Sequence, residues 1–157
     1  MADSHDHVPN VEKAVDVFVR ERVELVLHAG DFVAPFAVAP LARLDCEVVA
    51  VFGNNDGERL GLQRRFDQLG ARVEPNVATV EAGDLRIGVT HYPEVAEPMA
   101  QGDAFDLVVY GHTHQIDDRT LASRIVNPGE TGGWLTGRAT VMILDSESLM
   151  AEVVDLG

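Results

Sequence analysis

The residues of this chain that can bind metal ions lie beside short apolar segments. Asp3-Ser4-His5 and His112-Thr113-His114 each place two ligand types at positions i and i+2. In an extended segment such side chains point to one face, so each pair can approach one centre. The full set of candidate ligands is Asp3, His5, Asp31, Asn54, His91, His112 and His114. Carboxylate, amide and imidazole donors without a thiolate suit ions such as Mn²⁺, Fe²⁺, Ni²⁺ or Zn²⁺.

Each of these residues also has an ordinary interpretation when taken alone. A lone His91 is more often a surface or hydrogen-bonded histidine than a ligand, and Asp31 and Asn54 each follow a glycine, as turn residues do. However, all six histidines lie in or beside these loops, which independent turns would not produce. For His7 and His28 we expect hydrogen bonding in the core or behind the ligands.

The first half of the chain must alternate helices and strands to position these loops. Helices are predicted over residues 9–21, 35–44 and 58–69, and strands over 23–27 and 46–52. Pro40 weakens the second helix, whereas Gly70 is well placed to end the third. This order predicts a parallel sheet flanked by helices. Ligands bind such a sheet at the carboxyl ends of its strands, where Asp31 and Asn54 should lie.

The second half of the chain is dominated by predicted strands. Residues 77–81 and 85–90 flank Ala82-Gly83-Asp84, which predicts a hairpin. Further strands are predicted over residues 106–110, 124–126, 138–144 and 149–154. No repeat or flexible linker separates the halves, so we expect residues 1–157 to form a single domain.

The composition is that of a soluble globular protein. Hydrophobic residues make up 46% of the chain, but no apolar run approaches the roughly 18 residues of a membrane span. Residues 1–10 lack the apolar core of a signal peptide, and Cys46 is the only cysteine. A lone cysteine excludes an internal disulfide framework and fits a cytoplasmic protein.

The net charge is −14, and Lys13 is the only lysine. A surface this acidic disfavours non-specific nucleic-acid binding. It suggests a halophilic protein, because concentrated salt screens the self-repulsion of the charge. An ordinary acidic protein is the alternative.

Several motifs together resemble those of the calcineurin-like metallophosphoesterases in order and spacing. The motifs are Asp3-Ser4-His5, Gly30-Asp31, Gly53-Asn54-Asn55-Asp56, Thr90-His91 and Gly111-His112-Thr113-His114. The small size and Asn127-Pro128-Gly129-Glu130 are similar to the compact prokaryotic phosphodiesterases of that superfamily. The resemblance implies an α/β fold in which two β-sheets pack as a sandwich with helices on both outer faces.

The resemblance also implies a dinuclear site, with Mn²⁺ or Ni²⁺ favoured and Fe²⁺, Zn²⁺ or Mg²⁺ as alternatives. One metal ion would take Asp3, His5, Asp31 and His114, and the other would take Asp31, Asn54, His91 and His112. Asp31 would bridge them, and a metal-bridging hydroxide would attack a phosphodiester substrate. A possible homo-oligomer is left open.

Two departures from the family pattern concern catalysis and the substrate pocket. Many relatives have a histidine at the position of Asn55, which cannot donate a proton in its place. Asp56 would orient this loop, although an ordinary turn aspartate is the alternative. Tyr92 and Pro93 replace a glycine and a histidine and narrow the loop after His91. A missing proton donor favours diesters with good leaving groups over monoesters.

Two other functions compete with the enzyme. The same superfamily includes a scaffold subunit of the retromer coat, in which a degenerate metal site has become part of a protein interaction surface. The other alternative is a mononuclear metal-binding regulatory module. All seven ligand positions keep good ligands here, which favours the enzyme.

The N-terminus departs from the implied fold. There the Asp-x-His motif ends a first strand of roughly five residues, whereas only Met1 and Ala2 precede Asp3. We expect that strand to be absent, with its neighbours left unpaired and with Asp3 and His5 on a fraying segment that binds metal weakly. A start codon assigned too late is favoured over a genuinely shorter protein.

Overall fold

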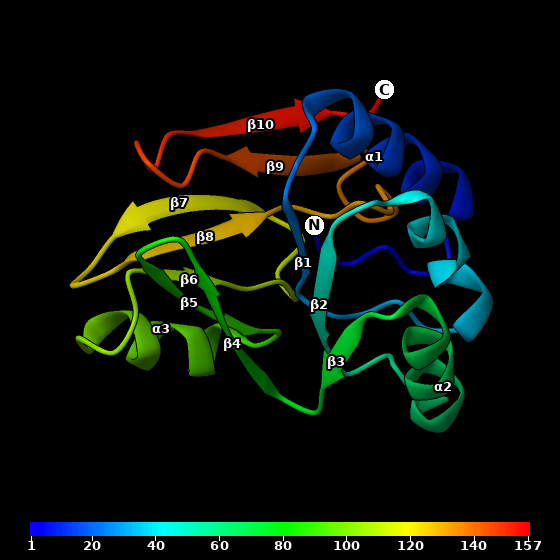
Figure 1. Ribbon diagram of the computed structural model, residues 1–157, viewed down its shortest axis with the longest axis horizontal. Helices are drawn as coiled ribbons and strands as arrows, with labels where there is room; N and C mark the ends of the chain where they lie inside the picture. Colours follow the sequence, from blue (N-terminus) through cyan, green and yellow to red (C-terminus); the bar gives the residue numbers. More distant parts are fainter.

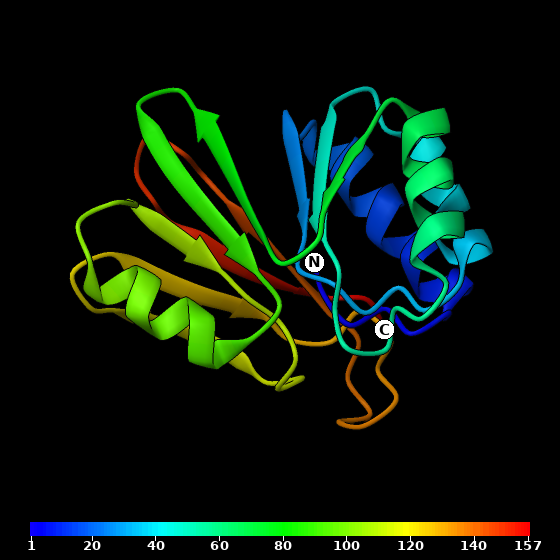
Figure 2. The ribbon, with the colours of Figure 1, turned by 90° about the horizontal axis from the view of Figure 1, so that it is seen from below.

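Two layers of β-strands with helices on their outer sides make up the structure, a computed structural model that describes residues 1–157 (Figures 1 and 2). The first half of the chain alternates helices with parallel strands. Its helices are α1 (Val8–Glu21), the 3₁₀ helix η1 (Pro35–Arg43) and α2 (Arg59–Leu69). Its strands are β1 (Leu25–His28), β2 (Glu47–Val51) and β3 (Arg72–Glu74), paired in the order β1-β2-β3.

The second half forms a five-stranded sheet and a two-stranded one. The larger sheet has the order β4-β5-β6-β8-β7 and mixes parallel with antiparallel pairs. Its strands are β4 (Val77–Ala82), β5 (Leu85–Thr90), β6 (Leu107–Val109), β7 (Ile116–Thr120) and β8 (Arg124–Pro128). Helix α3 (Pro93–Gln101) packs on it, and β9 (Thr140–Leu144) pairs antiparallel with β10 (Ala151–Asp155).

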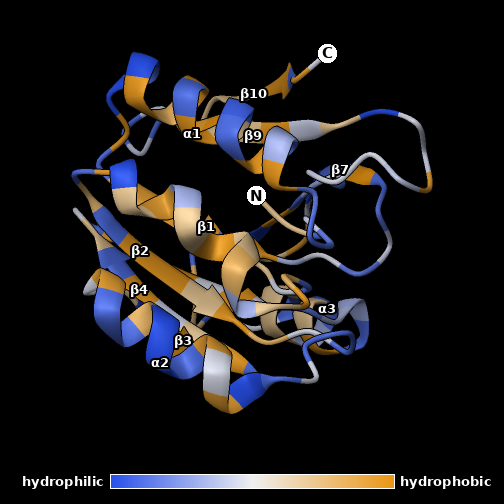
Figure 3. Cartoon of the chain, turned by 90° about the vertical axis from the view of Figure 1, so that its right-hand side faces the viewer, coloured by the Kyte–Doolittle hydropathy of each residue, from blue (hydrophilic) through white to orange (hydrophobic).

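Two apolar cores hold the layers together. One lies between the helices and the β1-β2-β3 sheet and includes Val15 and Phe18 of α1 and Phe66 of α2. The other lies between the sheets, where Val49 and Val51 of β2 face the five-stranded sheet. Hydrophilic and hydrophobic residues alternate along α1 and α2, so each helix buries one face (Figure 3). Each fully buried Val or Phe contributes roughly 1.5–3 kcal/mol.

The predicted fold class is confirmed, and the corrections concern single elements. Residues 35–43 form a 3₁₀ helix rather than an α-helix. Pro40 inside this segment lacks the N–H that an α-helix needs, and its ring clashes with the carbonyl of residue i−4. Helix α3 and the short strands β3 and β7 were not predicted. Pro93 is favourable at the first turn of α3, and the strand β7 is largely exposed and polar.

No strand precedes α1, as expected, but the segment before it is well anchored. Met1 to Ser4 are buried, and Asp3 N–H donates to Gly30 O at 3.0 Å. On the opposite side, Thr131 N–H donates to Ala2 O at 2.8 Å. The expected fraying of this segment is therefore not seen, because its backbone is bonded on both sides. No helix of the structure is both long and apolar enough for a membrane span.

Candidate metal centre

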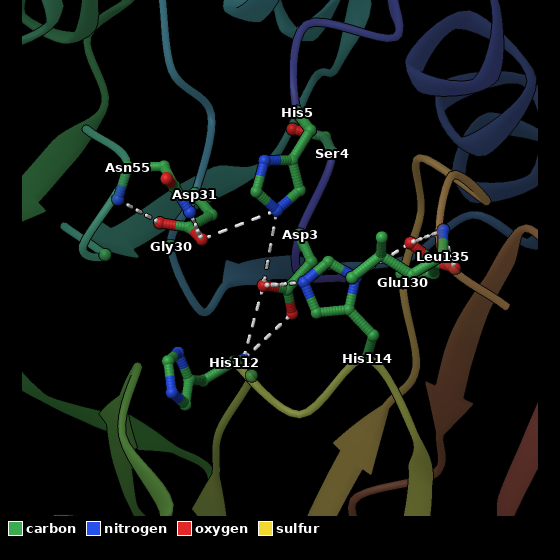
Figure 4. A network of polar contacts seen from close by, with 12 residues as sticks. Asp3, Ser4, His5, Gly30, Asp31, Asn55, His112, His114, Glu130 and Leu135 are labelled. Carbon is green, nitrogen blue, oxygen red and sulfur yellow. Dashed lines mark hydrogen bonds and ion pairs between the residues drawn. The ribbon is translucent and has the colours of Figure 1, made fainter. Parts of the chain in front are cut away.

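The candidate ligands come together where strands of both layers end. Asp31 follows β1, Asn54 follows β2, and His91 follows β5. The loop after β6 carries His112 and His114, while Asp3 and His5 come from the segment before α1. Figure 4 shows His5 between Asp31 and Asp3, with His114 on the other side of Asp3. The structure thus gathers all seven predicted residues at one end of the sandwich.

The atoms that face one another in the first group are nitrogen and oxygen donors at metal-site spacing. His5 Nε2 lies 3.4 Å from Asp31 Oδ2 and 3.9 Å from Asp3 Oδ1. His114 Nε2 lies 3.5 Å from Asp3 Oδ1. Ligand atoms of Asp3, His5 and His114 all lie within 4.8 Å of one another, close enough to share one ion.

A second group lies on the other side of Asp31. His91 Nε2 lies 3.5 Å from Asp31 Oδ2 and 2.9 Å from Asn54 Oδ1. The same Asn54 oxygen lies 2.9 Å from His112 Nδ1. Asp31 therefore faces both groups, and ligand atoms of Asp3, Asp31 and His91 also lie within 4.8 Å of one another, so the carboxyl groups of Asp3 and Asp31 lie between the two sets of histidines.

The Nδ1 atoms of His91 and His114 have hydrogen-bond partners that orient the two rings. His91 Nδ1 lies 2.7 Å from Ala29 O, and His114 Nδ1 lies 2.7 Å from a Glu130 carboxylate oxygen. These oxygens favour a proton on each Nδ1 atom, which leaves the His91 Nε2 atom facing Asp31 and the His114 Nε2 atom facing Asp3. An Nε2 lone pair that faces a carboxylate oxygen needs a proton or a metal cation between the two atoms.

Burial sharpens this requirement for a cation. The pKa of Asp3 is raised to about 8, first by burial and then by the charge of Asp31. Burial also lowers the pKa of His5 and His91, which favours the neutral imidazole that binds metals. His5 Nε2 is the buried side-chain polar atom of the structure without a hydrogen-bond partner. Its orphaned lone pair fits a divalent metal ion as the missing partner.

The backbone at the site is strained. Five of the seven candidate ligands have left-handed φ angles between +41° and +70°, namely Asp3, His5, Asp31, His112 and His114. Such angles are uncommon for residues other than glycine and cluster at functional sites. The loops therefore hold these side chains toward one another, and the strained backbone costs of order 1–3 kcal/mol for each residue.

Two glycines leave room for the carboxylates. A Cβ at Gly53 would overlap Asp31 Oδ1, and one at Gly111 would come within 2.8 Å of Asp3 Oδ2. Any larger residue at either position would displace a candidate ligand.

Asn55 and Asp56 differ in what they contact. Asn55 donates to Asp31 from its backbone N–H and its side-chain amide, both at 2.8 Å. The Asp56 carboxylate is buried and accepts from the backbone N–H groups of Asp31, Val33 and Gly53 at 2.7–3.0 Å. Asp56 therefore joins the loops after β1 and β2, whereas Asn55 orients the carboxylate of Asp31.

The two histidines expected outside the ligand set have other partners. His28 is buried, with Nε2 at 3.2 Å from the Ser4 hydroxyl and Nδ1 accepting from Gly30 N–H. His7 caps α1 by accepting from Asn10 N–H at 3.2 Å. Tyr92, the N-cap residue of α3, places its ring beside those of His91 and His112, as expected for a narrowed loop.

Glu130 is the site residue whose role the sequence did not reveal. Its fully buried carboxylate accepts from His114 Nδ1 and from the backbone N–H groups of Trp134, Leu135 and Thr136. Burial alone would raise the pKa of Glu130, but the bonds from Thr136, His114 and Leu135 outweigh it and lower the pKa to about 2. The glycines around residues 129–137 were the available hint of a tightly folded loop.

The loop held by Glu130 brings apolar surface to the edge of the site. Trp134 is 61% exposed and Leu135 is 75% exposed. The Trp134 indole N–H donates to His5 O at 3.1 Å, and its ring packs on His7. Trp134 is therefore fixed next to the segment that carries His5.

The chain is similar to known proteins both in sequence and in structure. Residues 1–149 match the calcineurin-like phosphoesterase superfamily domain. A phosphodiesterase of Methanocaldococcus jannaschii is 39% identical over 151 residues, which cover 94% of this chain and 91% of that protein. A probable metallophosphoesterase of Methanothermobacter thermautotrophicus is 30% identical, in a match that covers 100% of this chain and 91% of that protein. The solved structure of an archaeal phosphodiesterase superposes with a TM-score of 0.93 at 36% identity, covering 99% of this chain and 96% of that one.

Proposed function

The chain belongs to the calcineurin-like phosphoesterase superfamily and is a phosphodiesterase of that family, and we propose that it hydrolyses small phosphodiesters at a dinuclear metal site. The observation that carries this proposal is the convergence of three imidazole nitrogens, from His5, His91 and His114, on the buried side chains of Asp3 and Asp31. The named relative at 39% identity supports the diester as substrate class.

Each of the two groups of side chains would bind one metal ion. Asp3, His5, Asp31 and His114 would hold one ion, and Asp31, Asn54, His91 and His112 the other. Mn²⁺ or Ni²⁺ suits this mixture of oxygen and nitrogen donors. When bound, such ions would activate a water molecule as nucleophile near neutral pH and would neutralise the charge that develops on phosphoryl oxygens.

Other side chains would orient the candidate ligands and the substrate. Asn55 holds the Asp31 carboxylate through two hydrogen bonds, so its amide is engaged and has no acidic proton for a leaving group. Substrates whose leaving group departs without protonation are therefore favoured. Trp134 at the rim offers an apolar surface for one ester group of the substrate.

The direct test is hydrolysis of bis-p-nitrophenyl phosphate by the intact protein. We expect chelation to abolish activity and Mn²⁺ or Ni²⁺ to restore it. Asp31→Asn keeps the shape of the proposed bridge but removes its charge, and we expect a loss greater than about 100-fold, because even residues behind metal ligands contribute about 10–100-fold. The matched control, Asp84→Asn, lies in the exposed β4–β5 turn and should keep full activity. Equal activity of both variants would refute the assignment.

A further inference from the structure

Arg59 holds both ends of the loop formed by residues 53–56. Its Nε donates to Asp56 O at 3.1 Å, and its Nη2 donates to Gly53 O at 3.2 Å. The guanidinium carbon also lies 5.2 Å from the centre of the Phe52 ring, within the range of a cation–π contact. Three contacts therefore fix the side chain of a residue that is exposed to solvent.

This loop carries one candidate metal ligand and one supporting residue. Asn54 Oδ1 lies 2.9 Å from both His91 Nε2 and His112 Nδ1. The side-chain amide of Asn55 donates to Asp31 at 2.8 Å (Figure 4). Neither the N–H nor the carbonyl of Asn54 is bonded to another backbone group. The position of Asn54 therefore depends on how the residues on either side of it are held.

The loop is attached to its surroundings on two sides. The Gly53 N–H donates to the buried carboxylate of Asp56 at 2.7 Å, and the Asp31 N–H donates to the same carboxylate at 3.0 Å. This carboxylate therefore joins the loop to the residues that follow β1. The carbonyl groups of Gly53 and Asp56 accept from Arg59, so Arg59 joins the same loop to helix α2.

Helix α2 is a rigid base for this arginine. Arg59 is the first residue of the helix, which is anchored in the core by the fully buried Leu62 and Phe66. Gly61 lets the same turn pack closely, because a Cβ there would come within 2.8 Å of Pro35 Cγ. Helical side chains lean toward the N-terminus of their helix, so Arg59 reaches back over the loop that precedes α2.

The guanidinium of Arg59 forms no ion pair, although the chain has 26 acidic residues. Two roles are open to such a group: its charge would attract an anionic substrate, or its forked donors would fix the loop. The contacts favour the second role, because two of its nitrogens are bonded to carbonyl groups of one loop. A lysine would keep the charge but not the planar fork, so the two roles can be separated.

We propose that Arg59 is a positioning residue that holds Asn54 in place for its metal ion, an inference that rests on the proposed phosphodiesterase function. Arg59 acts through the loop 53–56 and touches neither the ion nor the substrate. The other ion has separate support, because Glu130 holds His114. Loss of the Arg59 guanidinium should therefore weaken binding of the ion at Asn54 more than binding of the other ion.

The test compares the unsubstituted chain with Arg59→Met, Arg59→Lys and the control Arg64→Met, which changes an exposed arginine of the same helix. Each metal-free protein is titrated with Mn²⁺ by isothermal titration calorimetry. The binding step that belongs to Asn54 is identified as the one that Asn54→Ala removes. We expect both substitutions of Arg59 to weaken this step about 10–100-fold, with a smaller effect on the other step. Arg64→Met should change neither step.

A second measurement involves neither metal nor hydrolysis. Asn55 N–H donates to Asp31 Oδ1 at 2.8 Å, so its hydrogen exchange in the metal-free protein reports on the loop. We expect Arg59→Met and Arg59→Lys to speed this exchange by at least about tenfold, and Arg64→Met to leave it unchanged. If the unsubstituted chain binds a single Mn²⁺ ion, the dinuclear function fails, and the exchange of Asn55 then decides whether Arg59 holds the loop.

Three results would overturn the proposal. Arg59→Lys could behave like the unsubstituted chain, which would show that the charge of Arg59 matters and its fork does not. Both binding steps could weaken equally, or Arg64→Met could have the same effects, and either result would indicate a general loss of stability. Finally, Arg59→Met could leave both the exchange of Asn55 and the affinity for Mn²⁺ unchanged.

Discussion

At the scale of single residues, the site is built from imidazole nitrogens and carboxyl oxygens that a shared metal ion would hold together. The Nε2 atoms of His91 and His114 face the carboxyl groups of Asp31 and Asp3, and His5 Nε2 has no hydrogen-bond partner. Three of the candidate ligands are held by hydrogen bonds from behind: Asp31 by Asn55, His91 by Ala29 O and His114 by Glu130. Such supporting hydrogen bonds set the direction and basicity of a ligand.

Asn55 provides a test of this support. Asn55→Ala removes the side-chain bond to Asp31 without removing a ligand, so we expect Mn²⁺ to bind about 10–100-fold more weakly. Isothermal titration calorimetry measures this affinity, and the exposed Asn76→Ala variant is the matched control. An unchanged affinity in Asn55→Ala would show that the asparagine does not orient Asp31.

At the scale of elements, the loop 131–137 depends on one buried carboxylate. Glu130 gathers the N–H groups of Trp134, Leu135 and Thr136, and the loop in turn carries the apolar surface beside the site. Loss of the negative charge should loosen this loop as well as His114.

The acid stability of the metal-free protein tests the role of Glu130. Its pKa is about 2 in the folded protein and 4.5 ordinarily, so the charged form stabilises the fold above pH 4.5 and this contribution is lost as the pH falls toward 2. We expect Glu130→Gln to lower the free energy of unfolding by roughly 3 kcal/mol at pH 7. Urea denaturation should show this deficit shrinking below pH 4.5, whereas a deficit independent of pH would contradict it. Glu152→Gln, exposed on β10, is the control.

Sequence patterns predicted the elements in which apolar residues recur at the spacing of a helix or a strand. Helix α1 buries Val11, Val15 and Phe18 at helical spacing, so its prediction needed no tertiary information. Strand β7 is exposed and polar and exists through its pairing with β8, which no local pattern reveals. In the same way, the motifs predicted which residues meet at the site, but Glu130 reaches His114 only through the folded loop.

At the scale of the whole molecule, the site joins the two layers. The segment Met1–Asp3 is bonded to β1 and the residues after it on one side and to Thr131 and Gly132 on the other. We therefore propose that residues 1–157 form a single domain. Cytoplasmic location and homo-oligomer formation stay predictions.

The charge of the molecule predicts a dependence on salt. Acidic residues number 26 against 12 basic ones, and six arginines are already engaged in surface ion pairs. Raising KCl from about 0.1 M to about 1 M shortens the screening length from about 10 Å to about 3 Å. We expect the melting temperature to rise with KCl because repulsion among unpaired carboxylates is screened. A protein equally stable in dilute buffer would not be halophilic.

The number of metal ions per active chain tests the central claim most directly. Metal-free protein is titrated with Mn²⁺, and bound metal is counted by inductively coupled plasma mass spectrometry while hydrolysis of bis-p-nitrophenyl phosphate is followed on the same samples. We predict that activity saturates at two ions per chain. Full activity with one ion or none, or tight binding of two ions without hydrolysis, would contradict a dinuclear phosphodiesterase.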